Sequence, residues 1–223
     1  MEISIIAPIK MLDFCCTRTH YVLPSLLLES EEYLDFYIEK QKLGHTIVMD
    51  CTKIGWKREP ELLETTIKAT QELSPEEVIL PSLMYNLIKT KEVVSEYLDT
   101  YWKEGFSLVG CLEGTSLSEL EECRDNLVDL GIKNWALPAH CYRFSKKIEN
   151  ISYYIDNWES PSELKDKKGV LFTSLPVRLG LQGRLLSNYK PTPPLLTFKE
   201  DSTQFGEVIR KNIEEMIEYY DSD

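Results

Sequence analysis

The chain has 223 residues, a formal net charge of −12, and 43% hydrophobic and 28% charged residues, which is typical of an ordinary globular protein. No apolar run approaches the roughly 20 residues of a membrane span, and no basic segment followed by an apolar one opens the chain, so we expect neither a membrane protein nor a signal peptide. The six cysteines are scattered without a CxxC pair, which predicts reduced thiols and a cytoplasmic location.

Apolar, strand-like runs alternate with amphipathic helical stretches along the chain, as in β/α units around a parallel sheet. The expected strands are 3–8, 45–50, 76–82, 106–114, 133–139, 151–157 and 169–174, with a mixed extended segment at 21–28. The expected helices are 31–42, 61–73, 90–103, 115–131, 160–169 and 205–220. Gly44 and Gly131 are placed to end two of these helices, and Ser116 or Ser118 to cap one.

About seven or eight such repeats, without a low-complexity linker, predict a single α/β domain over residues 1–223. We expect a small (β/α)8 TIM-type barrel with one helix trimmed between "ALPAHCYR" and "ISYYIDN". A doubly wound open sheet is the alternative. The sequence has neither a glycine-rich dinucleotide fingerprint nor a phosphate loop, and we expect no cofactor and no metal.

Polar residues end several of the expected strands, and in a barrel these ends form the active face. Three apolar strands end in a carboxylate, so we expect Asp50, Glu113 and Asp156 to converge as catalytic acids. Lys and Arg outnumber Asp and Glu by ten to five between Lys133 and Lys190, which indicates a basic, phosphate-binding face. The expected substrate-binding residues are Ser82, His140, Arg143, Thr173, Ser174, Arg178 and Arg184.

The order of these motifs resembles the tRNA-guanine transglycosylase superfamily, nearest to the short phage branch that inserts 7-deazaguanine into DNA. The similarity runs from about Thr46 to Leu186 and is carried by "IVMDCTKIGW", "VILPS", "LVGCLEGTSLSELEECRDNL", "NWALPAHCYR", "YYIDNWESPSEL" and "VLFTSLPVRLGLQGRLL". The resemblance implies a (β/α)8 barrel and a base exchange on nucleic acid, in which one aspartate attacks the sugar and another recognises a purine or deazapurine base.

The chain departs from this family at several positions. Thr173 matches the nucleophilic aspartate, Ser82 the second base-recognising aspartate, and Glu113 a glutamine, while the zinc-binding cysteine cluster is absent. Asp50 is retained, and Asp156 is a possible substitute nucleophile.

Two functions remain open from these residues. The first is a glycosyltransferase-like enzyme acting on the base–sugar bond of DNA, RNA or a nucleotide, with DNA favoured over RNA. The second is a catalytically altered homologue that binds nucleic acid or a partner enzyme subunit. In either case the chain could form a homodimer or a heteromer.

Overall fold

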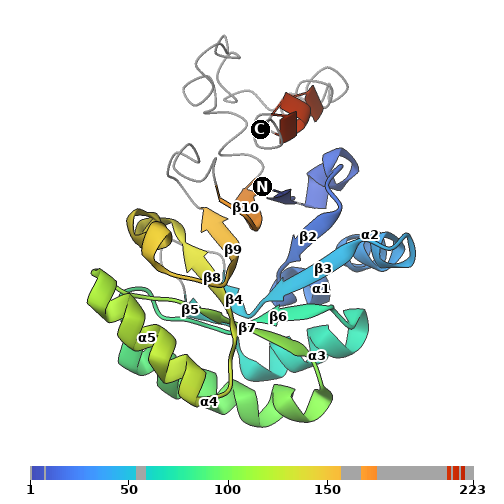
Figure 1. The fold of residues 1–223 in the computed structure, drawn as a ribbon. Helices are drawn as coiled ribbons and strands as arrows, with labels where there is room; N and C mark the ends of the chain where they lie inside the picture. The colour runs from blue at the N-terminus through green and yellow to red at the C-terminus, as the bar shows by residue number, and fades with distance from the viewer. Residues whose placement is uncertain are drawn as a thin grey trace.

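The computed structural model describes residues 2–7, 9–53, 59–156, 167–174, 210–211, 213–215 and 217–218. In these residues eight parallel strands form one sheet in the order β1-β10-β9-β8-β7-β6-β3-β2. The two ends of this order, β1 and β2, lie beside each other. The hydroxyl of Thr19 on β2 donates a 2.6 Å hydrogen bond to Oε1 of Glu2 on β1. The sheet therefore curls into a barrel (Figure 1).

Seven of the eight described barrel strands lie where the apolar runs predicted strands, and β2 is the exception. The eight strands are β1 (Glu2–Ile6), β2 (Thr19–Val22), β3 (Thr46–Asp50), β6 (Glu77–Ile79), β7 (Ser107–Cys111), β8 (Asn134–Pro138), β9 (Ile151–Asp156) and β10 (Val170–Ser174). The mixed segment at 21–28 divides into the end of β2 and helix α1 (Pro24–Glu29), which begins at a proline. A short antiparallel pair, β4 (Thr52–Lys53) and β5 (Glu59–Pro60), follows β3 and was not predicted.

The connecting helices cover the outside of the strands (Figure 1). They are α2 (Glu31–Lys42), α3 (Leu63–Leu73), α4 (Leu87–Glu104) and α5 (Leu117–Asp129). The predicted ends are confirmed, because the Ser116 hydroxyl accepts a hydrogen bond from the Glu119 amide and Gly44 has a φ of 81°. Among the described helices, none is both long and apolar enough to cross a membrane.

Two connections are 3₁₀ helices, η1 (Ile9–Phe14) and η2 (Ala139–Lys147). The second occupies the position where a trimmed helix was expected. The predicted (β/α)8-like α/β fold is thus confirmed, although the ring of helices is partly incomplete. The alternative, an open doubly wound sheet, is wrong because the two end strands of the sheet lie side by side and close it into a barrel. The expected helix at 205–220 is helical at its described residues, whereas most of 160–169 lies outside the described residues.

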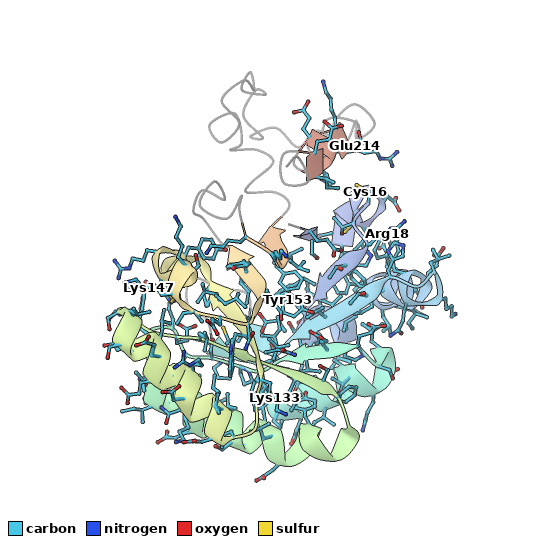
Figure 2. The ribbon with its side chains drawn as sticks, viewed as in Figure 1. Cys16, Arg18, Lys133, Lys147, Tyr153 and Glu214 are labelled. Atoms are coloured by element: carbon cyan, nitrogen blue, oxygen red, sulfur yellow. The ribbon has the colours of Figure 1, made fainter. Side chains whose placement is uncertain are left out.

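Side chains fill the inside of the barrel, so its centre is a packed core. Phe172 lies between two tyrosines, with ring centroids 4.4 Å from Tyr21 and 5.0 Å from Tyr153. Tyr153, which is labelled in Figure 2, lies inside the barrel. Its hydroxyl donates a 2.5 Å hydrogen bond to Oε2 of Glu77. A second apolar layer lies between the sheet and the helices and contains Ile47, Met49, Leu80, Leu112 and Leu137. Because side chains fill the inside of the barrel, we expect a ligand-binding or catalytic site at the ends of the strands.

Candidate functional site

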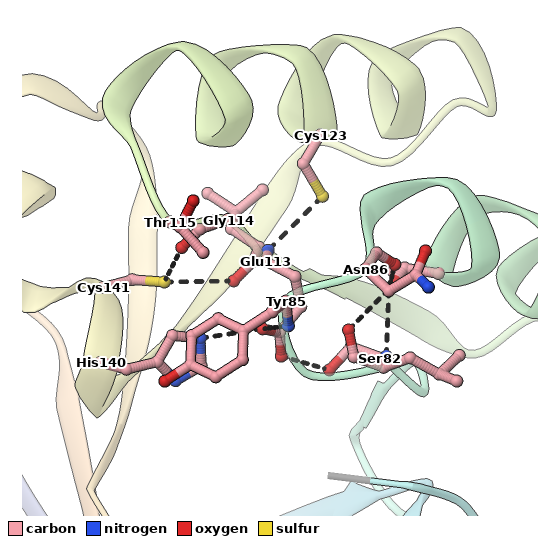
Figure 3. A network of polar contacts seen from close by, with 12 residues as sticks. Ser82, Tyr85, Asn86, Glu113, Gly114, Thr115, Cys123, His140 and Cys141 are labelled. Atoms are coloured by element: carbon pink, nitrogen blue, oxygen red, sulfur yellow. Dashed lines mark hydrogen bonds and ion pairs between the residues drawn. The ribbon is translucent and has the colours of Figure 1, made fainter. Parts of the chain in front are cut away.

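Three predicted residues from three neighbouring strands meet at the carboxyl end of the barrel. Ser82 follows β6, Glu113 follows β7 and His140 follows β8. The strands are parallel and adjacent, so residues just beyond their ends lie at one edge of the barrel. Figure 3 shows the three side chains pointing toward one another.

The Glu113 carboxylate is the centre of this group and is fully buried. Its Oε1 accepts a 2.9 Å hydrogen bond from the Ser82 hydroxyl. Its Oε2 accepts a 3.3 Å bond from the Tyr85 backbone amide and lies 2.9 Å from Nε2 of His140 (Figure 3). Both oxygens thus have donors, as a buried carboxylate requires.

The backbone of residues 113–114 is held by two buried thiols. The Glu113 amide donates to Sγ of Cys123 on α5 at 3.5 Å, and Sγ of Cys141 on η2 donates to the Gly114 carbonyl at 3.4 Å. Burial, with a smaller contribution from the Glu113 charge, raises the pKa of Cys141, and burial raises that of Cys123 to about 11. The two thiols are therefore neutral at physiological pH and position the loop as weak hydrogen-bonding groups.

Gly114 lets this loop lie against the start of α5. A Cβ atom at this position would lie 3.0 Å from both Cβ of Glu119 and the backbone nitrogen of Leu120. A larger residue would push the loop, and the neighbouring Glu113, away from the helix. The carboxylate is thus fixed by backbone packing as well as by its hydrogen bonds.

The Glu113 contact selects a tautomer of His140. An ionised carboxylate only accepts hydrogen bonds, so the Nε2 atom that faces Glu113 carries a hydrogen. In the neutral ring, Nδ1 then holds the lone pair and can accept a proton. The His140 side chain is 14% exposed, so it lies between the buried carboxylate and the solvent side of the strand ends.

Tyr85, which the sequence reading did not select, completes the group. Its ring makes an edge contact with the His140 ring, with centroids 4.6 Å apart and planes at 62° (Figure 3). Tyr85 follows β6 by a few residues and directly precedes Asn86, the N-cap of α4. The available signal was an aromatic residue in a loop after a barrel strand, because such loops carry the active-site residues of this fold.

Asp50 is fully buried at the end of β3, two strands from Glu113 in the sheet. Its Oδ1 accepts hydrogen bonds from the Thr52 amide at 3.0 Å and the Thr52 hydroxyl at 2.7 Å. These bonds shape the turn into β4. The expected convergence of Asp50 with Glu113 stays a prediction, as does its catalytic role.

Arg143 is exposed on η2 and reaches the loop that carries Glu113. Its Nη2 donates a 2.6 Å hydrogen bond to the Thr115 carbonyl, and its guanidinium lies 4.6 Å from the centroid of the Phe144 ring. The Thr115 amide and hydroxyl each donate to Oε2 of Glu119 at 2.7 Å. In this structure Arg143 therefore ties η2 to the β7–α5 loop, and its substrate-binding role stays a prediction.

The remaining predicted residues belong to the last two strands or follow them. Asp156 ends β9 and pairs in register with Thr173 on β10, while Ser174 pairs with Ile6 on β1. Their backbones thus lie at the same end of the barrel as Glu113, and the roles of their side chains stay predictions. Arg178 and Arg184 lie outside the described residues. Among the described residues, no group of three or more His, Cys, Asp or Glu side chains could hold a metal ion.

Comparison with known proteins gives structural neighbours and no sequence relatives. The sequence matches no protein-family model and no curated protein. A D-tagatose 3-epimerase-like protein aligns with a TM-score of 0.57 at 12% identity, over 98% of this chain and 97% of that one. A D-psicose 3-epimerase from Clostridium cellulolyticum H10, solved with D-tagatose, aligns with a TM-score of 0.56 at 9% identity, over 97% and 99%.

A second D-psicose 3-epimerase, solved in the presence of D-fructose, aligns with a TM-score of 0.53 at 11% identity, over 96% of this chain and 97% of that one. At these identities the likeness establishes the barrel fold. This chain folds as a barrel of the kind found in sugar epimerases.

These findings correct the expected family and activity. The chain is structurally similar to sugar epimerases, so the placement in the tRNA-guanine transglycosylase superfamily is wrong. The glycosyltransferase activity, the base exchange on DNA and the link to phage 7-deazaguanine chemistry are wrong with it. The matched motifs misled because each one is a short apolar strand with a polar end, and such segments recur in order in any β/α barrel. Nothing in the described residues supports a nucleic-acid or nucleotide partner.

Proposed function

We propose that this protein is an enzyme that moves a proton on a small polyhydroxylated carbonyl compound, as sugar isomerases and epimerases do. The observation that carries the proposal is the Glu113–His140 pair, whose Oε2 and Nε2 atoms lie 2.9 Å apart at the carboxyl end of the barrel. A buried carboxylate that fixes the tautomer of a partly exposed imidazole prepares that imidazole to act as a general base.

In the proposed step, Nδ1 of His140 accepts a proton from the carbon next to the substrate carbonyl. The electron pair of the broken C–H bond forms a C=C bond, and the carbonyl oxygen takes the negative charge of an enediolate. Return of this proton from the His140 imidazolium to the former carbonyl carbon, with the neighbouring hydroxyl proton passing to the former carbonyl oxygen, completes an isomerisation. Delivery of a proton from solvent to the opposite face of the original carbon, while the His140 imidazolium releases its proton to solvent, completes an epimerisation. The Glu113 carboxylate stabilises the imidazolium formed in between, because it lies against Nε2–H.

Ser82 is not placed to be a nucleophile in this group. Its hydroxyl donates to Oε1 of Glu113, whereas His140 faces Oε2 of the same carboxylate. In a nucleophilic triad the serine donates to the histidine, and the histidine donates to the acid. Here the acid lies between the other two, so the arrangement favours proton transfer by His140 over attack by Ser82.

The test is solvent deuterium exchange. The purified protein is incubated in D₂O with D-fructose, D-psicose and D-tagatose, the sugars named for the structural neighbours. Proton NMR follows the loss of the signal at the carbon next to the carbonyl and the appearance of a product sugar. We expect exchange with the wild type, and a loss of about 100-fold or more in His140→Gln.

His45→Gln is the matched control. His45 precedes β3 and lies at the opposite end of the barrel from His140, so this variant keeps wild-type exchange. No exchange of any of the sugars by the wild type, or equal exchange by His140→Gln, would contradict the proposal.

The six cysteines are all free, which supports a reducing compartment such as the cytoplasm for this enzyme.

A further inference from the structure

Tyr85 has an unusual backbone for an aromatic residue. Its φ is 62°, in the left-handed region that side chains bearing a Cβ rarely adopt. Such conformations cost free energy and persist where surrounding contacts enforce them, which occurs often at functional sites. Here the conformation places the Tyr85 amide 3.3 Å from Oε2 of Glu113, where it satisfies a buried charge.

The Tyr85 side chain is held beside His140 and yet remains open to solvent. Its ring contacts the imidazole at a centroid distance of 4.6 Å, and the residue is 53% exposed. Among the described residues it is the single aromatic one in the group of large, exposed apolar side chains, which otherwise contains Leu43, Leu62, Ile88 and Val128. A large aromatic surface left in water beside a carboxylate–imidazole pair is a feature of a ligand-binding wall.

We propose that Tyr85 is a specificity-determining residue that contacts the substrate directly, with its ring against the C–H side of a small polyhydroxylated molecule. The inference rests on the proposed function and assigns the surface beside His140. The face of an aromatic ring carries partial negative charge, whereas the hydrogens on the carbon skeleton of a sugar carry partial positive charge. Contact with the ring thus presents the carbon skeleton to Nδ1 of His140 and leaves the hydroxyl groups to other partners.

A purely structural role would make different demands on Tyr85. If only its amide mattered, any residue that adopts a φ of 62° would replace it, and glycine would do so without strain. If only packing on His140 mattered, loss of the ring would change turnover and leave ligand binding intact. A substrate contact instead predicts that binding itself depends on the ring.

The test measures binding separately from turnover. Saturation-transfer NMR with D-fructose, D-psicose and D-tagatose gives apparent affinities for the wild type, Tyr85→Phe, Tyr85→Ala and Tyr85→Gly. We expect Tyr85→Phe to bind within about twofold of the wild type, and both Tyr85→Ala and Tyr85→Gly to lose about tenfold, since the ring contact is absent from both. Ile88→Ala, which removes a side chain 66% exposed at the start of α4, is the matched control and binds like the wild type.

The outcomes separate this inference from the proposed function. Binding that depends on the Tyr85 ring supports the inference, even where deuterium exchange is absent and the proposed reaction fails. Binding that is equal in the wild type and Tyr85→Gly overturns it, although exchange that depends on His140 would leave the reaction standing. The inference is also overturned if none of the three sugars binds to the wild type. Circular dichroism and thermal unfolding of each variant confirm that the compared proteins are folded.

Discussion

Nε2 of His140 lies 2.9 Å from Oε2 of Glu113, although the two residues are 27 positions apart in the sequence. Strands β7 and β8 bring them together, because each residue follows its strand by two positions. The same carboxylate accepts hydrogen bonds from the Ser82 hydroxyl and the Tyr85 backbone amide. One buried charge therefore organises side chains from three β/α units, and its removal gives the first prediction.

Glu113→Gln should disrupt the site and lower stability together. A glutamine at this position has one acceptor oxygen, and its NH₂ group faces donors that previously met an oxygen. We expect a loss of about 2–3 kcal/mol in the free energy of unfolding, measured by urea denaturation, with loss of deuterium exchange. Glu122→Gln, an exposed change on α5, is the control and should alter neither quantity. A Glu113→Gln variant as stable as the wild type would contradict the role assigned to this carboxylate.

The barrel was predictable from the sequence because its strands are short apolar runs separated by helices with recognisable ends. Asp50, Ser82 and Glu113 could be selected from the same pattern, since each follows an apolar run and fold geometry places strand ends together. The pattern does not specify which strand ends exchange hydrogen bonds. Ser82, Glu113 and His140 make contact through register and loop conformation, which depend on pairings distant in sequence.

Tyr85 shows why part of the site escaped prediction. Its contribution arises from a left-handed backbone that turns the amide toward Glu113, and only the structure reveals this conformation at a tyrosine. The activity was misassigned for a related reason. Strand-end residue types identify the active face of a barrel, and many unrelated chemistries use the same face.

The second prediction concerns His20, which is fully buried on β2 beside α2. Burial, with smaller contributions from His45 and Lys40, lowers the pKa of His20 from 6.5 to about 3. The folded protein thus excludes a proton that the unfolded chain binds below pH 6.5, so stability falls as the pH decreases from about 6.5 toward 3. We expect His20 to account for about 2 kcal/mol of lost unfolding free energy between pH 7 and pH 5.

Urea denaturation of the wild type and His20→Phe at both pH values measures this contribution. The variant also loses the 2.8 Å contact between Nε2 of His20 and Nδ1 of His45, so its stability at pH 7 differs for other reasons. The informative quantity is the change between the two pH values, which should be smaller in the variant. Equal losses of unfolding free energy in the two proteins would show that the pKa of His20 is not lowered in the folded protein.

The third prediction is that Cys16 is the reactive thiol of the chain. Cys16 is exposed, whereas the other five cysteines are buried. Burial raises the pKa of Cys15 to about 11, and that of Cys16 is also raised from 9.0, because part of its surface is covered. Figure 2 shows Cys16 near the helical residues that carry Glu214, whose charge contributes to the shift. With an aromatic disulfide reagent at pH 8, one thiol should react in the native protein, more slowly than a free thiol.

Cys16→Ser should remove that reaction and leave the others unchanged, while denaturant should expose all six thiols of the wild type. Rapid labelling of a second cysteine in the native state would mean that one of the buried positions opens easily. Peptide mass mapping of the labelled protein identifies the residue in either case.

The last prediction concerns the packing of Gly110, on the strand β7 that precedes Glu113, against Leu127 of α5. A Cβ atom at Gly110 would lie 2.9 Å from Cδ1 of Leu127, 3.1 Å from Cγ2 of Ile132 and 3.3 Å from Cε3 of Trp135. Gly110→Ala should therefore lower the unfolding free energy by about 1–3 kcal/mol, because the buried Leu127 and Ile132 side chains must shift within a packed core. Leu127→Ala removes the nearest atom, so Gly110→Ala should cost less in that background. Urea denaturation of the four proteins of this cycle measures the difference, and additive costs would show that Gly110 and Leu127 are not in close contact.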